Sequence, residues 1–392
     1  MAHISLYRKY RPDTFEGVFG QDHIVRTLKN QVKTGNVSHA YLFTGTRGTG
    51  KTSTARIFAR AINCEHPVDG SPCGKCDCCK EAANPACLDI LEIDAASNNG
   101  VDEIRDLREK VNYPPVTLKY KVYIIDEVHM LSTPAFNALL KTLEEPPKHA
   151  VFILATTEVH KLPATILSRC MRFDFRLVST ELLAKNLADI FDKEGRKYQP
   201  EAVRLIATAG AGSVRDSLSI ADMCLSYCDE EITYDKVLEA LGASDPNLIC
   251  SLCGDIISSD VGAALKKINK LSSCGKNMAV LASDVAECFR NILYVKNIKD
   301  ADDELGLPKP ILAKLKTLSE TVANSRILLI LDIFNGISGE LRFSSQPQIV
   351  VEAAIARAAT EKDVSTAAIV AGCKKLEQRI MQLEARGLPR RS

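Results

Sequence analysis

The sequence contains no apolar run long enough to cross a bilayer, because its longest such stretch, Ile327–Phe334, is interrupted by Asp332. The first residues, Met1–Phe15, also lack the apolar segment of a secretory signal. We therefore expect a cytoplasmic protein without membrane contact. Thiols stay reduced in that compartment, so the 14 cysteines are not expected to form mainly disulfides.

An excess of charge of one sign is absent as well. Lys and Arg total 50 against 49 Asp and Glu, a net charge of +1, so any contact with a polyanion must come from a local patch. Tryptophan is also missing, which excludes nothing. The 46% hydrophobic and 25% charged residues are ordinary for a globular protein and exclude a disordered or collagen-like chain. A chain of 392 residues predicts two or three domains.

The pattern of apolar residues divides the chain into an α/β part and helical parts. In residues 1–178, buried strands alternate with helical segments, which indicates a parallel sheet. The predicted strands are Ala40–Thr44, Leu88–Ile93, Lys121–Ile125 and Ala150–Ala155. The predicted helices between them are Thr52–Ile62, Val101–Val111 and Pro134–Leu143. Strand signals stop after Ser179, so we predict helical domains over 179–242 and 243–362, then a C-terminal helix and basic tail over 363–392.

A phosphate-binding motif follows the first predicted strand. Gly45–Thr52 (GTRGTGKT) matches G-x4-G-K-[ST], in which glycines let backbone N–H groups point at phosphate oxygens. Lys51 is expected to bind the β- and γ-phosphates and Thr52 to ligate Mg²⁺. The alternative, a glycine-rich turn without a ligand, is disfavoured because a strand precedes the motif and a helix follows it. The residues predicted to bind nucleotide here are Gly45, Thr46, Gly48, Thr49, Gly50, Lys51, Thr52 and Ser53.

Two carboxylates complete the predicted nucleotide site. Asp126 and Glu127 follow an apolar strand, and α/β sheets bind ligands at the carboxyl ends of their strands. Asp126 is expected to hold Mg²⁺ and Glu127 to polarise the attacking water. An acidic pair at a helix start is the alternative, but it does not explain both motifs in one α/β domain. The sequence thus predicts binding and hydrolysis of a nucleoside triphosphate.

Four cysteines predict a structural zinc site. Cys64, Cys73, Cys76 and Cys79 are spaced C-x8-C-x2-C-x2-C, which brings four thiolates to one tetrahedral ion. Such a zinc contributes about 10–16 kcal/mol to folding, and the polar segment 64–79 has little core of its own. Cys78 could replace Cys76 or Cys79 as a ligand. A redox pair or free thiols remain the alternatives.

Together these motifs resemble a known family. The chain is similar to the γ/τ subunits of bacterial DNA polymerase III, which are AAA+ clamp-loader ATPases. The similarity covers the first 242 residues densely and is weaker beyond them. Besides the phosphate loop and the four cysteines, the matching segments are Tyr7–Pro12 with Phe15, Val18–Gln21, His39–Phe43, Ile93–Ser97, Ile125–Met130, Leu143–Pro147, Ala155–Thr157, Ile166–Cys170 and Gly212–Asp216.

The resemblance implies roles that residue spacing does not. Arg169 would be a finger that enters the ATP site of the neighbouring subunit in trans, and Arg215 would sense the γ-phosphate in cis. Thr157 would be a polar sensor that orients water. For each arginine the alternative is a surface ion pair. The adenine-binding segment would include Tyr7, Arg8, Pro12 and Val18.

The family also implies a fold, cofactors and partners. The fold would be an α/β AAA+ domain with a parallel sheet and an inserted zinc module, then a small helical lid and an all-α collar. ATP, Mg²⁺ and Zn²⁺ would be bound. The partners would be other clamp-loader subunits in a hetero-oligomer (a pentamer), the sliding clamp and primer–template DNA. Asn98 and Asn99, before the Val101 helix, and Arg105 would contact DNA phosphates.

Two other functions compete with a clamp-loading motor. The chain could be mainly a non-catalytic scaffold that bridges replisome components, although its complete nucleotide motifs argue against that. An AAA+ helicase or unfoldase is the other alternative. Such machines usually carry an aromatic pore loop between the two nucleotide motifs, where this chain has its cysteines.

Overall fold

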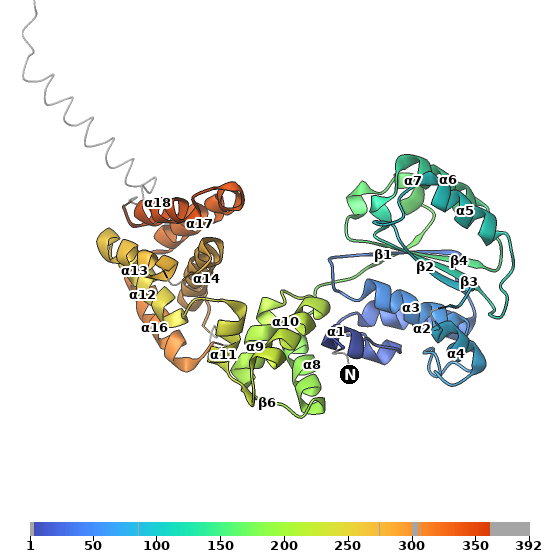
Figure 1. Cartoon of the computed structure of the whole chain (residues 1–392), viewed down its shortest axis with the longest axis horizontal. Coiled ribbons are helices and arrows are strands. Elements are labelled where there is room, and N and C mark those ends of the chain that lie inside the picture. Colours follow the sequence, from blue (N-terminus) through green and yellow to red (C-terminus); the bar gives the residue numbers. More distant parts are fainter. Residues whose placement is uncertain (1–3, 85, 274, 300–304, 306, 361–392) are drawn as a thin grey trace, which may run out of the picture. The chain divides into compact units, whose positions relative to one another are not determined.

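A computed structural model describes residues 4–84, 86–273, 275–299, 305 and 307–360 (Figure 1). The chain forms two compact units, of which the first ends at Tyr234 and the second begins at Asp235. The predicted C-terminal helix and basic tail, 363–392, lie outside the described residues.

The first unit is built on a parallel sheet, as the sequence predicts, and the sheet has five strands, one more than the four predicted. Its strands are β1 (Ala40–Thr44), β2 (Ile90–Asp94), β3 (Lys121–Asp126), β4 (Ala150–Thr156) and β5 (Met171–Asp174), in the order β2-β3-β4-β1-β5. The register pairs Asp94 with Asp126 and Thr44 with Thr156, so the carboxyl ends of these strands lie at one edge.

Helices cover both faces of this sheet (Figure 1). On one face lie α2 (Asp22–Thr34) and α3 (Lys51–Ile62), and on the other α5 (Val101–Val111), α6 (Thr133–Glu144) and α7 (Ala164–Leu167). β3 contributes Val122 and Ile124 to one core and Tyr123 and Ile125 to the other. Burial on both sides explains why its sequence is a continuous apolar run.

Shorter elements of the first unit lie around the sheet. The N-terminal segment contains α1 (Leu6–Lys9) and the 3₁₀ turn η1 (Phe15–Gly17), and α4 (Asp77–Ala83) belongs to the cysteine-rich segment. Two more 3₁₀ turns, η2 (Val128–Met130) and η3 (Val159–Lys161), follow β3 and β4.

Helices α8 (Thr180–Lys193), α9 (Pro200–Ala209) and α10 (Val214–Tyr227) follow the sheet. The first helix begins after Ser179, whose hydroxyl accepts a hydrogen bond from Leu182 N at 3.4 Å. Capping by serine side chains satisfies backbone donors that a helix start leaves free. Ser213 caps α10 in the same way, accepting from Asp216 N at 3.2 Å.

Three strands differ from the sequence prediction. The prediction that strands stop after Ser179 is wrong at β6 (Lys197–Tyr198) and β7 (Glu231–Ile232), a parallel pair. Each has two residues, too few for a periodic pattern to mark. β5 was not predicted either, because only Phe173 of its four residues is buried.

The second unit is helical over its described part. Its helices are α11 (Tyr234–Leu241, which begins at the last residue of the first unit), α12 (Pro246–Ile257), α13 (Val261–Ser273), α14 (Met278–Asn297), α16 (Lys309–Thr321), α17 (Asn324–Phe343) and α18 (Pro347–Thr360). Among the described residues of the chain, no helix combines the length and apolarity needed to span a membrane.

Candidate functional site

A cavity of about 440 Å³ opens at the carboxyl ends of β2 and β3. Four parts of the first unit line it: the N-terminal segment, the phosphate loop Gly45–Thr52, the two strand ends and the helices α8 and α10. Residues from the two predicted nucleotide motifs therefore line the same space.

The phosphate loop requires glycine at three positions. Gly45, Gly48 and Gly50 have φ angles of 140°, 77° and 101°, which side chains with a Cβ rarely adopt. At Gly48 a Cβ would also overlap the Ser213 hydroxyl. The Gly48 carbonyl accepts hydrogen bonds from Val214 N at 3.1 Å and Arg215 N at 3.4 Å. The loop is thus bonded to the first turn of α10.

Lys51 and Thr52 are both placed by bonds within the site. The Lys51 ammonium donates to the carbonyls of Gly45 and Thr46, each at 2.9 Å. Loss of hydration lowers the pKa of Lys51, and the charges of Glu127 and Asp126 partly oppose this. The Thr52 hydroxyl donates to Asp126 Oδ2 at 2.7 Å. The two residues predicted to hold Mg²⁺ are therefore adjacent.

Glu127 is held in an uncommon backbone conformation. Its φ of 48° lies in the left-handed region, which is costly for a residue other than glycine and recurs at functional sites. Glu127 Oε2 accepts from Thr157 N at 3.2 Å and from the Thr157 hydroxyl at 2.9 Å. His129, which the sequence did not single out, places Nδ1 3.3 Å from the same oxygen and 3.0 Å from Thr156 Oγ1. Thr157 thus contacts the candidate base and is not among the residues that line the cavity.

The N-terminal segment and α10 meet at the cavity. Tyr7 and Arg215 both line it, with the guanidinium carbon 5.1 Å from the ring centroid. Pro12 and Val18, two of the residues that the resemblance assigns to the adenine segment, line it too. Arg8 does not, and Arg11 takes its place. Arg11 follows the end of α1, whose last helical residue is Lys9, so its place in the lining comes from the non-helical segment and not from a helix face.

The same segment is tied to the end of α8. The Lys9 ammonium donates to Glu194 Oε1 at 2.6 Å, and the Tyr10 hydroxyl donates to the same oxygen. Burial, together with the carboxylate of Glu194, raises the pKa of Tyr10 to about 12. The hydroxyl therefore stays protonated and bonded at neutral pH.

Arg169 lies away from the cavity of its own chain. Its Nη2 donates to Glu144 Oε1 at 2.8 Å and its Nη1 to the Thr165 carbonyl at 2.8 Å. It is not among the residues that line the cavity.

Sequence reasoning did not name a group of residues that line the cavity, because which side chains of a segment face it depends on tertiary packing. Gly17, Asn186 and Leu218 lie outside every segment that the sequence singled out, whereas the others lie inside such segments without having been named as site residues. The missed residues are Tyr10, Arg11, Gly17, Phe19, Arg47, Asp94, Ala96, Asn186, Val214 and Leu218.

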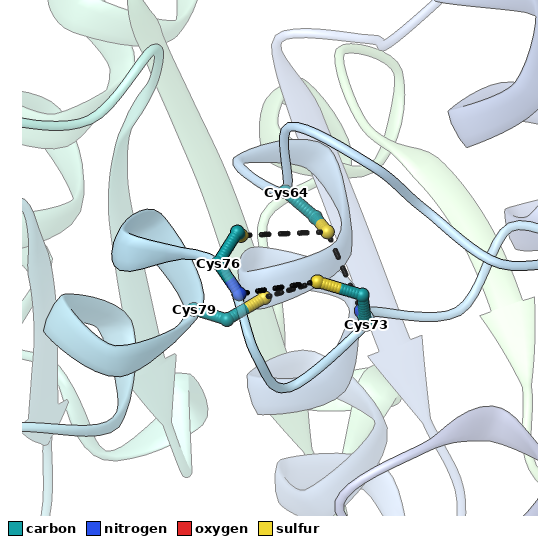
Figure 2. A group of neighbouring side chains, drawn as sticks. All are labelled: Cys64, Cys73, Cys76 and Cys79. Atoms are coloured by element: carbon teal, nitrogen blue, oxygen red, sulfur yellow. Dashed lines mark hydrogen bonds between the residues drawn. The ribbon is translucent and has the colours of Figure 1, made fainter.

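The four predicted zinc ligands lie together (Figure 2). The sulfur atoms of Cys64, Cys73, Cys76 and Cys79 are all within 4.8 Å of one another. Two pairs, Cys64 with Cys76 and Cys73 with Cys79, are 3.9 Å apart. A tetrahedral zinc with Zn–S bonds of about 2.3 Å separates its sulfurs by about 3.8 Å. The donor set and its spacing fit this ion.

The fifth thiol of the segment does not belong to this group. Cys78 donates to Glu65 Oε1 at 3.4 Å, on the outside of α4. Backbone N–H groups of Lys75 and Cys76 lower the pKa of Cys73 to about 6, whereas burial raises the pKa of Cys64 and of Cys79. Hydrogen bonds that stabilise a thiolate favour the form that binds metal.

The candidate DNA residues surround the start of α5 but already have partners there. Asn98 donates through its side chain to the Asp94 carbonyl at 3.0 Å, and Arg105 pairs with Asp102 at 3.1 Å. Asn99 uses its carbonyl to accept from Ser132 N at 3.2 Å. A phosphate at this helix start would have to compete with these bonds.

A parallel sheet with β1 between β4 and β5, a phosphate loop after β1 and carboxylates after β3 define a P-loop nucleotide-binding protein with a helical lid. Family models match nearly the whole chain. Residues 20–179 match "DNA polymerase III, delta subunit", 183–230 match "DNA polymerase III clamp loader subunit, ATPase lid domain", and 232–369 match "DNA polymerase III subunits gamma and tau domain III". The chain belongs to the γ/τ subunits of DNA polymerase III, the AAA+ clamp-loader ATPases of DNA replication.

Individual relatives agree with this assignment. DNA polymerase III subunit tau of Bacillus subtilis is 42% identical over 99% of this chain and 70% of that protein. Subunit tau of Escherichia coli is 42% identical over 76% of this chain, which spans 46% of that protein. Among solved structures, the Thermotoga maritima RuvB Holliday junction branch migration motor is 18% identical with a TM-score of 0.46, over 78% of this chain and 91% of that one. That likeness is too distant to add to the assignment.

Proposed function

We propose that this chain is the ATP-dependent motor subunit of a DNA polymerase III clamp loader, which hydrolyses ATP to load the sliding clamp onto primed DNA. One observation carries the proposal. The phosphate loop with Lys51, the Thr52–Asp126 pair and Arg215 of α10 all line one cavity. A purely structural scaffold would not need this arrangement.

Each residue of the site would have a separate role in binding or hydrolysing ATP. Lys51 exchanges its bonds to the Gly45 and Thr46 carbonyls for the phosphate oxygens of ATP, which have stronger negative charge. Thr52 and Asp126 would hold Mg²⁺, which neutralises charge on the phosphates when bound. Glu127 polarises the attacking water, and its bonds to Thr157 fix its orientation.

Two arginines would complete the site. Arg215 is already in the cavity and would contact the γ-phosphate when ATP binds. Arg169 lies outside its own cavity, which supports a role in the site of a neighbouring subunit. An arginine supplied in this way is worth about 10³–10⁵ in rate.

The zinc site would be structural. All four ligands are thiols and fill a tetrahedral shell, so no open position remains for a substrate or water. We propose that Zn²⁺ fixes the module 64–79 beside α3, as part of an AAA+ domain over 1–178. A lid over 179–242 and a collar over 243–362 would follow.

The proposed partners are other clamp-loader subunits in a pentameric hetero-oligomer, the sliding clamp and primer–template DNA. With a net charge of +1 and a helix start whose polar groups are already bonded, each chain would hold DNA weakly. Several subunits on one duplex would supply the affinity through avidity.

The decisive experiment measures ATP hydrolysis by the reconstituted assembly with and without clamp and primed DNA. We expect turnover to rise when both are present and to vanish with Lys51→Ala in every copy. A scaffold would show the same assembly with no dependence on Lys51. A helicase or unfoldase would respond instead to duplex DNA or to unfolded protein.

A further inference from the structure

Asn186 is a polar residue in an apolar stripe of α8. It lies three residues after Leu183 and four before Ile190, both of which are buried. Only 8% of Asn186 is exposed, and it lines the nucleotide cavity. A packing role would be served better by leucine, since a buried carboxamide costs free energy unless it is hydrogen-bonded.

The carboxamide of Asn186 has no hydrogen-bond partner in the part of the chain that the structure describes. An amide on a cavity wall that is not bonded to the protein is free to bond to a molecule inside the cavity. The space into which this one opens is the cavity itself.

The cavity is divided by chemistry. Lys51, Thr52 and the carboxylates Asp126 and Glu127 occupy the phosphate end. The lining contributed by the N-terminal segment and α10 includes the apolar residues Pro12, Val18, Val214 and Leu218, which suit the flat faces of a base. Asn186 is the one side-chain amide in the lining, so it is placed to contact the edge of that base.

A side-chain carboxamide presents one acceptor and one donor group in a plane. Adenine presents the matching pair, the N6 amino group as donor beside a ring nitrogen as acceptor, and asparagine binds this pair in nucleic acids. We propose that Asn186 reads the N6 edge of adenine and is a specificity-determining residue of the ATP site. This inference rests on the proposed function and adds to it a residue that selects the base.

The test compares MgATP with the Mg²⁺ complex of purine riboside triphosphate, which differs only by lacking the N6 amino group. Binding is measured by isothermal titration calorimetry on the full chain. The unmodified chain should bind ATP about tenfold more tightly, the effect of one buried hydrogen bond. In Asn186→Leu this ratio should fall to about one, while the affinity for inorganic tripolyphosphate stays unchanged. Lys185→Leu, an exposed neighbour on α8, is the matched control and should keep the full ratio.

Three results would overturn the inference. The first is equal affinity of the unmodified chain for the two nucleotides, a comparison that needs no variant to fold. The second is an Asn186→Leu chain that keeps the tenfold ratio. The third is an Asn186→Leu chain that loses affinity for ATP and tripolyphosphate alike, which would mean that Asn186 only shapes the lid. If the unmodified chain binds neither tripolyphosphate nor ATP, the proposed function fails together with this inference.

Discussion

Glu127 illustrates how the surroundings of a single residue add to what its motif predicts. The motif predicts a carboxylate next to the attacking water. The structure adds a left-handed backbone and two hydrogen bonds from Thr157 that fix one oxygen. His129 lies against the same oxygen. The side chain is therefore oriented before any nucleotide binds.

The residue-scale prediction concerns Glu127→Gln. This change keeps the size of the side chain but removes the charge that polarises water, so turnover should fall about 10²–10⁴-fold. The affinity for MgATP should stay within a few-fold, because Lys51 and the phosphate loop are unchanged. Single-turnover hydrolysis and equilibrium nucleotide binding measure the two effects separately. Hydrolysis at the normal rate would remove Glu127 from the mechanism.

The nucleotide motifs were predictable at this scale, and the rest of the cavity was not. Lys51, Thr52 and Asp126 belong to contiguous motifs whose residue types are set by phosphate and Mg²⁺ chemistry. Arg11, in the segment after α1, and Asn186, on α8, enter the cavity only because these parts pack beside it. Their positions depend on tertiary packing, which leaves no local pattern in the sequence. Arg8 was named in place of Arg11 because both lie in the matched segment Tyr7–Pro12, and a family match does not tell which of the two side chains reaches the cavity.

At the scale of elements, local sequence predicts the strands in the interior of the sheet better than the edge strand β5. β3 is buried on both faces and its run of apolar residues predicts it. β5 is an edge strand with Met171, Arg172 and Asp174 exposed, so its composition resembles a loop. Contacts between elements are less visible still, as the bond between the phosphate loop and α10 illustrates.

That bond gives a prediction for Gly48→Ala. The new methyl group would overlap the Ser213 hydroxyl, and alanine is strained at a φ of 77°. Gly48 would have to move from α10, so the affinity for MgATP should fall at least tenfold. The loss of folding stability should be about 1–3 kcal/mol. Gly35→Ala, at a φ of 70° in open space, is the control for strain alone and should leave nucleotide affinity unchanged.

The cysteine module gives a second prediction at this scale. Removal of metal with a chelator should lower the thermal midpoint of the first unit, because segment 64–79 depends on metal for its stability. Cys73→Ser should have the same effect, and metal analysis should find one zinc less per chain. Cys78→Ser is the control, since its thiol faces Glu65 and not the other four. A preparation that contains no zinc yet melts normally would contradict the assignment.

At the scale of the whole molecule, the position of Arg169 matters most. Its guanidinium is bonded to Glu144 on the outside of the first unit. A chain that lacks an arginine from a neighbour should hydrolyse ATP slowly on its own. Assembly would then control catalysis by completing each site.

The prediction for Arg169→Ala separates binding from catalysis. The isolated variant should bind MgATP as tightly as the unmodified chain, because Arg169 does not line its own cavity. Assemblies built from the variant should hydrolyse ATP about 10³-fold more slowly. Arg172→Ala, another exposed arginine nearby, is the control and should leave the rate within a few-fold. A drop in the slow rate of the isolated variant would place Arg169 in cis and refute the proposal.

The ties from Lys9 and Tyr10 to Glu194 have a practical consequence for anyone who handles the protein. The segment that carries these two residues also forms a wall of the cavity, although the phosphate loop comes much later in the chain. An affinity tag, fluorescent label or protease cut placed near Ser5 would therefore disturb nucleotide binding directly.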